Sequence, residues 1–220
     1  MTATPRGNPY WDEHYRPHSV DPDEIRSLCL RAFQIVLSSQ GVASLYDHSD
    51  DSDLEDPKGE PEEADEIEIP LLFELYRGNS ERLLSETLLK LAIFVRTLED
   101  QVQATDASER FKFFLAELNG EDGFGTVFEG PEGLVMSLRE CCNKIIHAED
   151  FRPVYEKDGA SDVPGGWAMD GQLELEGKLG KKEWKVAIYL IEFLEAVLGF
   201  CNEVQDWAAR VATENDAAPS

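Results

Sequence analysis

The chain has few basic residues and no long hydrophobic run. Only 20 lysines and arginines stand against 45 aspartates and glutamates, which gives a formal net charge of −25. A surface of that sign repels polyanions at long range, which argues against a general nucleic-acid binder. No apolar run approaches the roughly 18 residues of a membrane span, and residues 1–20 hold no hydrophobic signal-peptide core. We therefore expect a cytoplasmic protein with no membrane partner.

Cysteine and histidine are also scarce. The four cysteines, Cys29, Cys141, Cys142 and Cys201, show no C-x-x-C spacing, and the adjacent pair could hardly form a disulfide without strain. We expect buried free thiols. The four histidines show no H-E-x-x-H spacing, so the sequence predicts neither a metal site nor another cofactor.

Length and composition limit the domain organisation. With 220 residues, 42% of them apolar, the chain can bury one sizeable core. We predict one domain over 21–212, a flexible arm over 1–20 and a disordered tail over 213–220. Residues 47–68 hold twelve acidic residues and one lysine, a composition typical of a disordered insertion. That segment is either a solubilising spacer or a site for a protein partner.

Helical spacing of apolar residues accounts for most of the domain. Asp21, followed by Pro22 and two acidic residues, predicts a helix start, and Gly41 predicts its end. From Asn79 a helical apolar pattern continues for nearly seven turns, which predicts the longest helix. The predicted helices cover about 21–41, 79–102, 109–118, 132–147 and 190–212.

One region alternates instead with a period of two. Leu173 and Leu175 alternate with glutamates, and Trp184, Val186 and Ile188 alternate with Lys185 and other residues. Two such runs joined by a short connection predict a β-hairpin over 172–189. The predicted fold class is therefore mainly α, an up-and-down bundle of about four to five helices with one inserted β-hairpin.

The hairpin also carries a local excess of positive charge. Lys178, Lys181, Lys182 and Lys185 are opposed within their own span only by Glu183. Two interpretations stay open. The lysines are either a solvated hairpin tip or part of a surface that binds an anionic substrate.

The segment 138–148 is the most informative part of the chain. Arg139, Asn143 and His147 follow one another at intervals of four residues. Each step exceeds one helical turn by about 40°, so the three side chains form a slowly drifting stripe on one face. A cation, an amide and an imidazole on one face suggest phosphate chemistry. Alternatively, His147 interacts with the helix dipole and with the acidic residues that follow it.

This segment resembles the HEPN superfamily, the helical domains of prokaryotic toxins, abortive-infection proteins and RNA-processing nucleases. The resemblance rests on the block from Arg139 to His147, above all Asn143-Lys144-Ile145-Ile146-His147-Ala148, and on the helical order around it. The separation of Arg139 from His147 is longer than in active family members. Because two such motifs commonly face each other across a dimer cleft in the family, the resemblance implies a homodimer.

The resemblance implies a metal-independent endoribonuclease, with possible toxin or phage-defence roles and an RNA substrate. His147 would be the general acid/base, Arg139 would bind the phosphate and Asn143 would orient it, because an imidazole titrates near neutral pH and a guanidinium binds phosphate oxygens in pairs. Substrate contacts would come from Lys144, Lys181, Lys182 and Lys185. The alternative is a catalytically inactive dimeric module that engages an antitoxin or another protein partner through the acidic segment or the hairpin.

Overall fold

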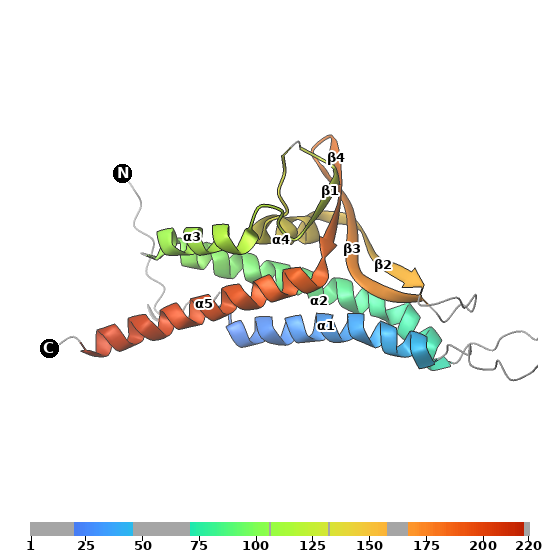
Figure 1. The fold of residues 1–220 in the computed structure, drawn as a ribbon, viewed down its shortest axis with the longest axis horizontal. Coiled ribbons are helices and arrows are strands. Elements are labelled where there is room, and N and C mark those ends of the chain that lie inside the picture. The colour runs from blue at the N-terminus through green and yellow to red at the C-terminus, as the bar shows by residue number, and fades with distance from the viewer. Residues whose placement is uncertain (1–19, 46–70, 106, 132, 158–166, 218–220) are drawn as a thin grey trace, which may run out of the picture.

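The computed structural model describes residues 20–45, 71–105, 107–131, 133–157 and 167–217. Within these residues the chain is mainly helical, with five helices and one four-stranded antiparallel sheet (Figure 1). In chain order the elements are α1 (Pro22–Leu45), α2 (Leu71–Gln103), α3 (Ser108–Asn119), β1 (Gly125–Glu129), α4 (Leu138–His147), β2 (Ala148–Lys157), β3 (Trp167–Leu179), β4 (Lys182–Tyr189) and α5 (Leu190–Ala217).

The predictions for the chain ends and the acidic segment fall largely outside the described residues. The expected arm is described only at Val20, and the whole acidic segment 47–68 lies outside. Of the expected tail, residues 213–217 belong to α5 and the last three residues lie outside the described part.

The helices form where predicted, but their bounds differ for local reasons. The backbone N–H of Asp23 donates to Oδ1 of Asp21 at 2.9 Å, so Asp21 caps α1 as predicted. Gly41 does not end that helix, because its φ is not positive and the helix continues to Leu45. Asn79 does not begin α2 either. Its side-chain amide donates to the carbonyl of Leu75 at 2.8 Å, inside a helix that already starts at Leu71.

The predicted hairpin is present as β3 and β4. Leu173 pairs with Ile188 and Leu175 with Val186, and all four side chains are buried on the inner face of the sheet. The turn between the strands is shorter than predicted, with Gly180 at a φ of 65°. Alternation of apolar and acidic residues therefore predicted the hairpin, and the structure supplies its register.

The sheet has two strands beyond the hairpin. Its order is β1-β4-β3-β2, so β1 and β2 are its edges. β1 lies in the glycine-rich segment between α3 and α4, outside the predicted helices and hairpin, and β2 begins directly after α4. Pro153 lies in β2, paired with Leu173. A proline is compatible with an edge strand, since only one side of such a strand needs its backbone N–H groups for pairing.

The core lies between the long helices and the inner face of the sheet. Figure 1 shows α1, α2 and α5 running along the long axis, with the sheet toward one end. In this view α3 and α4 lie together above the long helices. The backbone N–H of Met169 in β3 donates to Oγ of Ser39 in α1 at 2.9 Å, which ties the sheet to the helices. Fully buried members include Ile25, Leu88, Phe111, Leu173, Val186, Phe193 and Phe200.

Two further sequence predictions can be compared with the described residues. All four cysteines are free and buried, as predicted. No helix in the described part combines the length and the apolar character that crossing a membrane requires.

Candidate functional site

The short helix α4 carries the polar stripe, and two side chains fix its start. Oγ of Ser137 accepts a hydrogen bond from the backbone N–H of Glu140 at 3.2 Å, and Oδ1 of Asn119 accepts one from the N–H of Leu138 at 2.8 Å. These bonds satisfy two of the otherwise unpaired N–H groups of the first turn. They also explain why α4 begins at Leu138 and not near residue 132 as predicted. Its inner face buries Leu138, Cys141, Cys142 and Ile145.

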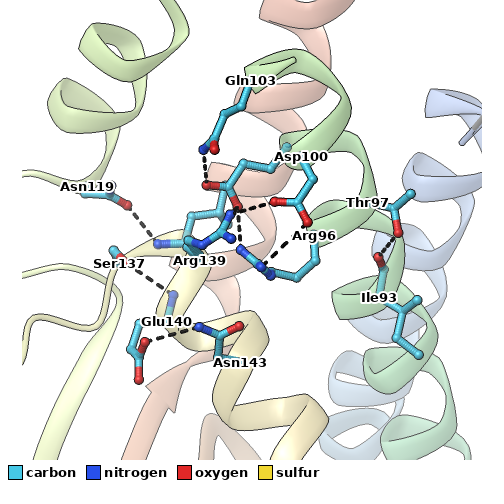
Figure 2. Close-up of polar contacts among 12 residues, drawn as sticks. Ile93, Arg96, Thr97, Asp100, Gln103, Asn119, Ser137, Arg139, Glu140 and Asn143 are labelled. Atoms are coloured by element: carbon cyan, nitrogen blue, oxygen red, sulfur yellow. Dashed lines mark hydrogen bonds and ion pairs between the residues drawn. The ribbon is translucent and has the colours of Figure 1, made fainter. Parts of the chain in front are cut away.

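Arg139 is held by two carboxylates of α2. Its guanidinium lies 2.9 Å from Oε2 of Glu99 and 3.0 Å from Oδ1 of Asp100. The Glu99 side chain is only 6% exposed and also contacts Arg96 at 3.2 Å and Gln103 at 3.1 Å. Figure 2 shows the guanidinium groups of Arg96 and Arg139 directed toward the carboxylate of Asp100 on α2.

This network determines the electrostatics of Arg139. Burial alone would lower the pKa of its guanidinium, but the hydrogen bonds to Asp100 and Glu99 outweigh burial and raise that pKa. The Arg139 side chain is still 40% exposed. Its charge, however, is already compensated by two carboxylates of the same chain. A phosphate would have to compete with both of them for the guanidinium.

Asn143 and His147 do not converge with Arg139 on a common point. His147 lies eight positions after Arg139 along the helix, a rise of about 12 Å. The amide of Asn143 donates to Oε2 of Glu140 at 3.3 Å, next to it on α4 (Figure 2). His147 is exposed, and within the described residues its imidazole has no hydrogen-bond or ion-pair partner. The structure therefore presents an imidazole on the surface, separate from the arginine.

The acidic residues after His147 pair elsewhere. Asp150 pairs with Arg152, and Glu149 lies 3.9 Å from Nζ of Lys178. The described contacts therefore include no pair between His147 and either of these acidic residues, which the alternative interpretation had expected.

Lys144 is buried and packs against an aromatic ring. Its Nζ lies 4.3 Å from the centre of the Trp184 ring and 3.3 Å from Oε1 of Glu140, and only 8% of the residue is exposed. A cation over an indole ring is attracted to the ring face. Gly177 makes room for that ring, because a Cβ there would lie 2.3 Å from Cζ2 of Trp184. Lys144 is thus part of the packing between α4 and the hairpin.

The remaining predicted substrate lysines lie at the hairpin. Lys185 has its Nζ 3.1 Å from Glu176 and 3.4 Å from Glu174, and these hydrogen bonds raise the pKa of Lys185. Lys181 and Lys182 are exposed at and beside the turn. The turn end of the sheet thus mixes both signs of charge, as a solvated hairpin tip does. The structure does not bring these lysines together with Arg139.

Other features of the site were not predicted from the sequence. Glu99, Asp100 and Trp184 complete the contacts of α4, but they are distant in sequence and no local pattern marks them. A second feature does have a sequence pattern. The outer face of α2 carries charged and apolar residues at alternating intervals of four and three, a spacing that keeps side chains on one stripe. We call it the α2 stripe, and it consists of Arg82, Glu86, Leu89, Ile93, Arg96 and Asp100.

The α2 stripe is largely exposed. Leu89 and Ile93 at its middle are 41% and 45% exposed. Arg82 pairs with Glu86 at 2.7 Å within the stripe, and Arg96, which is half-buried, lies 3.7 Å from Asp100. Two neighbouring apolar side chains between charged pairs make a surface that can pack against another helix.

The chemistry open to α4 follows from these contacts. Arg139 and Lys144, the two cations of the helix, are engaged by carboxylates. The exposed imidazole of His147 has no partner among the described residues. No group of three or more potential metal ligands occurs in the described part of the chain. Comparison of the chain with known protein families, characterised proteins and solved structures found no match.

Proposed function

We propose that this protein is a catalytically inactive, HEPN-like interaction module that works as a homodimer, with the α2 stripe as the contact between the copies. One observation carries the proposal, the self-complementary order of charges along that stripe. If two copies of α2 lie antiparallel about a two-fold axis at the level of Leu91, the apolar pair packs at the centre, with Leu89 against Ile93 of the second copy. The same symmetry operation places opposite charges together on both sides of this apolar centre.

The charge pairs follow directly from the sequence positions. Under that symmetry Glu86 would face Arg96 of the second copy, and Arg82 would face Asp100 of the second copy. Within one chain Arg82 pairs with Glu86, and Asp100 pairs with Arg96 and Arg139, so the contacts between the copies would add to these pairs or exchange with them. An isologous interface requires this kind of self-complementarity, because each residue must suit its symmetry-related counterpart. Opposite charges at the flanks of an apolar seam favour one orientation and one register.

The position of α4 suits the same interface. Arg139 contacts Glu99 and Asp100, while Tyr155, near the end of β2, donates from its hydroxyl to Glu81 at 2.9 Å. The chain from α4 into β2 therefore runs antiparallel to α2. A rise of about 12 Å from Arg139 brings His147 level with the Leu89 to Ile93 region. The dimer would place the two motif helices close to its axis, as the resemblance implies.

The lack of an available phosphate binder supports the inactive form of the module. Arg139 is held between two carboxylates and Lys144 lies under Trp184, so neither cation of α4 is free to bind phosphate. The strongly acidic chain further disfavours binding of RNA.

A second candidate function, a metal-independent endoribonuclease, has one observation in its favour. His147 is exposed and has no partner within the described residues, so its imidazole is available for proton transfer. Two such imidazoles near a dimer axis could act on one RNA. This candidate predicts RNA cleavage in the absence of metal ions and loss of that cleavage in His147→Ala.

Sedimentation velocity over a range of protein concentrations tests the dimer. We expect wild type to dimerise and Leu89→Asp to raise the dissociation constant at least about tenfold, because a charge in an apolar seam loses its hydration without gaining a partner. Phe113→Asp is the matched control, since Phe113 is an exposed apolar residue on α3, outside the stripe. A monomeric wild type, or equal weakening by both variants, would contradict the proposed interface.

A charge exchange tests the register. Arg82→Glu should weaken the dimer, and Arg82→Glu combined with Asp100→Arg should restore part of the affinity, because each new residue again meets the opposite charge in the second copy. Three further proposals accompany the module. They are the up-and-down order of the helices, a cytoplasmic location, and an antitoxin or another protein as the partner.

A further inference from the structure

The strand β1 is an edge of the sheet and has one unpaired side. The backbone N–H of Tyr189 donates to the carbonyl of Phe124 at 2.9 Å, and Thr126 pairs with Ala187. Because hydrogen bonding alternates along an antiparallel pair, the backbone groups of Gly125 and Val127 point away from β4. Within the described residues these outward groups have no hydrogen-bond partner.

A hollow of about 680 Å³ lies along this unpaired side. Figure 1 shows the segment that leaves β1 and returns to α4. At the base of this segment the N–H of Phe124 donates to the carbonyl of Met136 at 2.8 Å. The volume lies within the range of about 300–1,000 Å³ that ligand pockets occupy. Val127, Phe128, Pro131 and Leu134 contribute apolar side chains, Thr126 and Tyr189 lie at one side, and most of the exposed lining is polar.

The glycines of this region do not mark a phosphate site. A Cβ at Gly125 would lie 2.1 Å from the carbonyl oxygen of Ala187, and one at Gly123 would lie 2.5 Å from that of Met136. Close backbone packing therefore explains both glycines. Among the described residues none that lines the hollow is basic, and Asp122 lies in its wall, so these residues offer an anionic ligand no charge partner.

We propose that this hollow binds an extended peptide of another protein, which adds to β1 as a fifth strand. The outward groups of Gly125 and Val127 would form the ladder, and alternate apolar side chains would contact Phe128, which is 53% exposed, and the wall around it. β1 contains neither lysine nor proline, the residues that usually prevent pairing at an exposed edge.

Charge selects the kind of peptide. Glu121, Asp122 and Glu129 are exposed around β1, and the whole chain carries −25. The peptide that fits is apolar in its centre and has lysine or arginine at its ends. A second copy of β1 would bring the same acidic residues toward one another, which disfavours self-pairing. The site is separate from the α2 stripe, so it does not depend on the proposed dimer.

Fluorescence anisotropy with a labelled Lys-Lys-Val-Thr-Val-Thr-Val-Lys-Lys peptide tests the proposal. We expect wild type to bind this peptide in preference to the version with glutamate in place of lysine. Val127→Pro removes one outward N–H but no bond to β4, and an edge strand tolerates such a proline. We expect it to weaken binding at least about tenfold, because the ladder loses a hydrogen bond and its geometry.

Two further variants keep the test decisive if Val127→Pro fails to fold, which circular dichroism would reveal. Phe128→Ser removes one of the apolar side chains that line the hollow and should weaken binding, whereas Phe113→Ser, an exposed site on α3, should not. Absence of binding to wild type, equal binding of the acidic peptide, or unchanged binding by the hollow variants would overturn the proposal. So would a change in sedimentation of Val127→Pro in place of a change in peptide binding, because that result would make the occupant a second copy.

Discussion

Arg139→Met should destabilise the fold, because Arg139 neutralises a buried carboxylate. Breaking a fully buried charge pair costs about 3–5 kcal/mol, whereas exposed pairs contribute only about 0–1 kcal/mol. The Glu99 side chain is 6% exposed and the Arg139 side chain 40% exposed, and Glu99 retains Arg96 and Gln103 when Arg139 is removed. We therefore expect a loss of about 1–2 kcal/mol, or a fall in melting temperature of roughly 2–8 °C for a chain of this length.

A double-mutant cycle in urea isolates the pair. Glu99→Gln, Arg139→Met and the combined variant should give a coupling energy of about 1 kcal/mol, because each single change removes the same contact. Lys112→Met is the matched control, since Lys112 forms an exposed pair with Glu109 on α3 and should cost less than about 0.5 kcal/mol. A coupling energy near zero would refute the claim that Glu99 fixes Arg139, and would leave Asp100 as its carboxylate partner.

Three other predictions concern the core. Phe111→Ala should cost about 3–5 kcal/mol in urea unfolding, because Phe111 is fully buried and packs edge-on against two aromatic rings of α5; a loss below 1 kcal/mol would contradict this packing. Gly177→Ala should cost about 1–3 kcal/mol and shift tryptophan emission, since the new Cβ displaces Trp184. Burial raises the pKa of Cys29 to about 12 and of Cys201 to about 11. The unfolded chain loses these protons above about pH 8.5, so the contribution of the thiols to the free energy of unfolding should be complete below that pH. It should fall by about 1.4 kcal/mol per thiol and pH unit as the pH rises toward the folded pKa values. Changing both cysteines to alanine should flatten this slope.

Local patterns predicted the elements whose residues interact with near neighbours. Asp21 as the cap of α1 and the alternation around Leu173 and Leu175 both depend on groups a few residues away or on one face of a strand. Gly41 misled the prediction because helix termination depends on a left-handed backbone that a glycine permits but does not require. The mainly helical class with a hairpin was therefore accessible from the sequence.

The two edge strands were not accessible in the same way. β1 is only five residues long and lies among glycines, and β2 contains Pro153, so propensity alone argues against both. Both are strands because a partner already exists, β4 for one and β3 for the other. Pairing partners far apart in the chain cannot be inferred from a local period.

The site shows the same limit. The stripe of Arg139, Asn143 and His147 lies on α4, and the exposure of His147 follows from its place at the helix end. What the sequence does not indicate is that Glu99 and Asp100, some forty residues away, engage the arginine. Lys144 illustrates a second case, because its burial depends on Trp184 from the hairpin.

The most direct test of the account is incubation of total cellular RNA with the purified protein in EDTA, with wild type compared with His147→Ala under conditions where both are dimers. The account predicts intact RNA with both proteins, because Arg139 and Lys144, the two cations of α4, are already engaged by carboxylates or by an indole ring. Metal-independent cleavage by wild type that His147→Ala abolishes would contradict the inactive module and establish the nuclease.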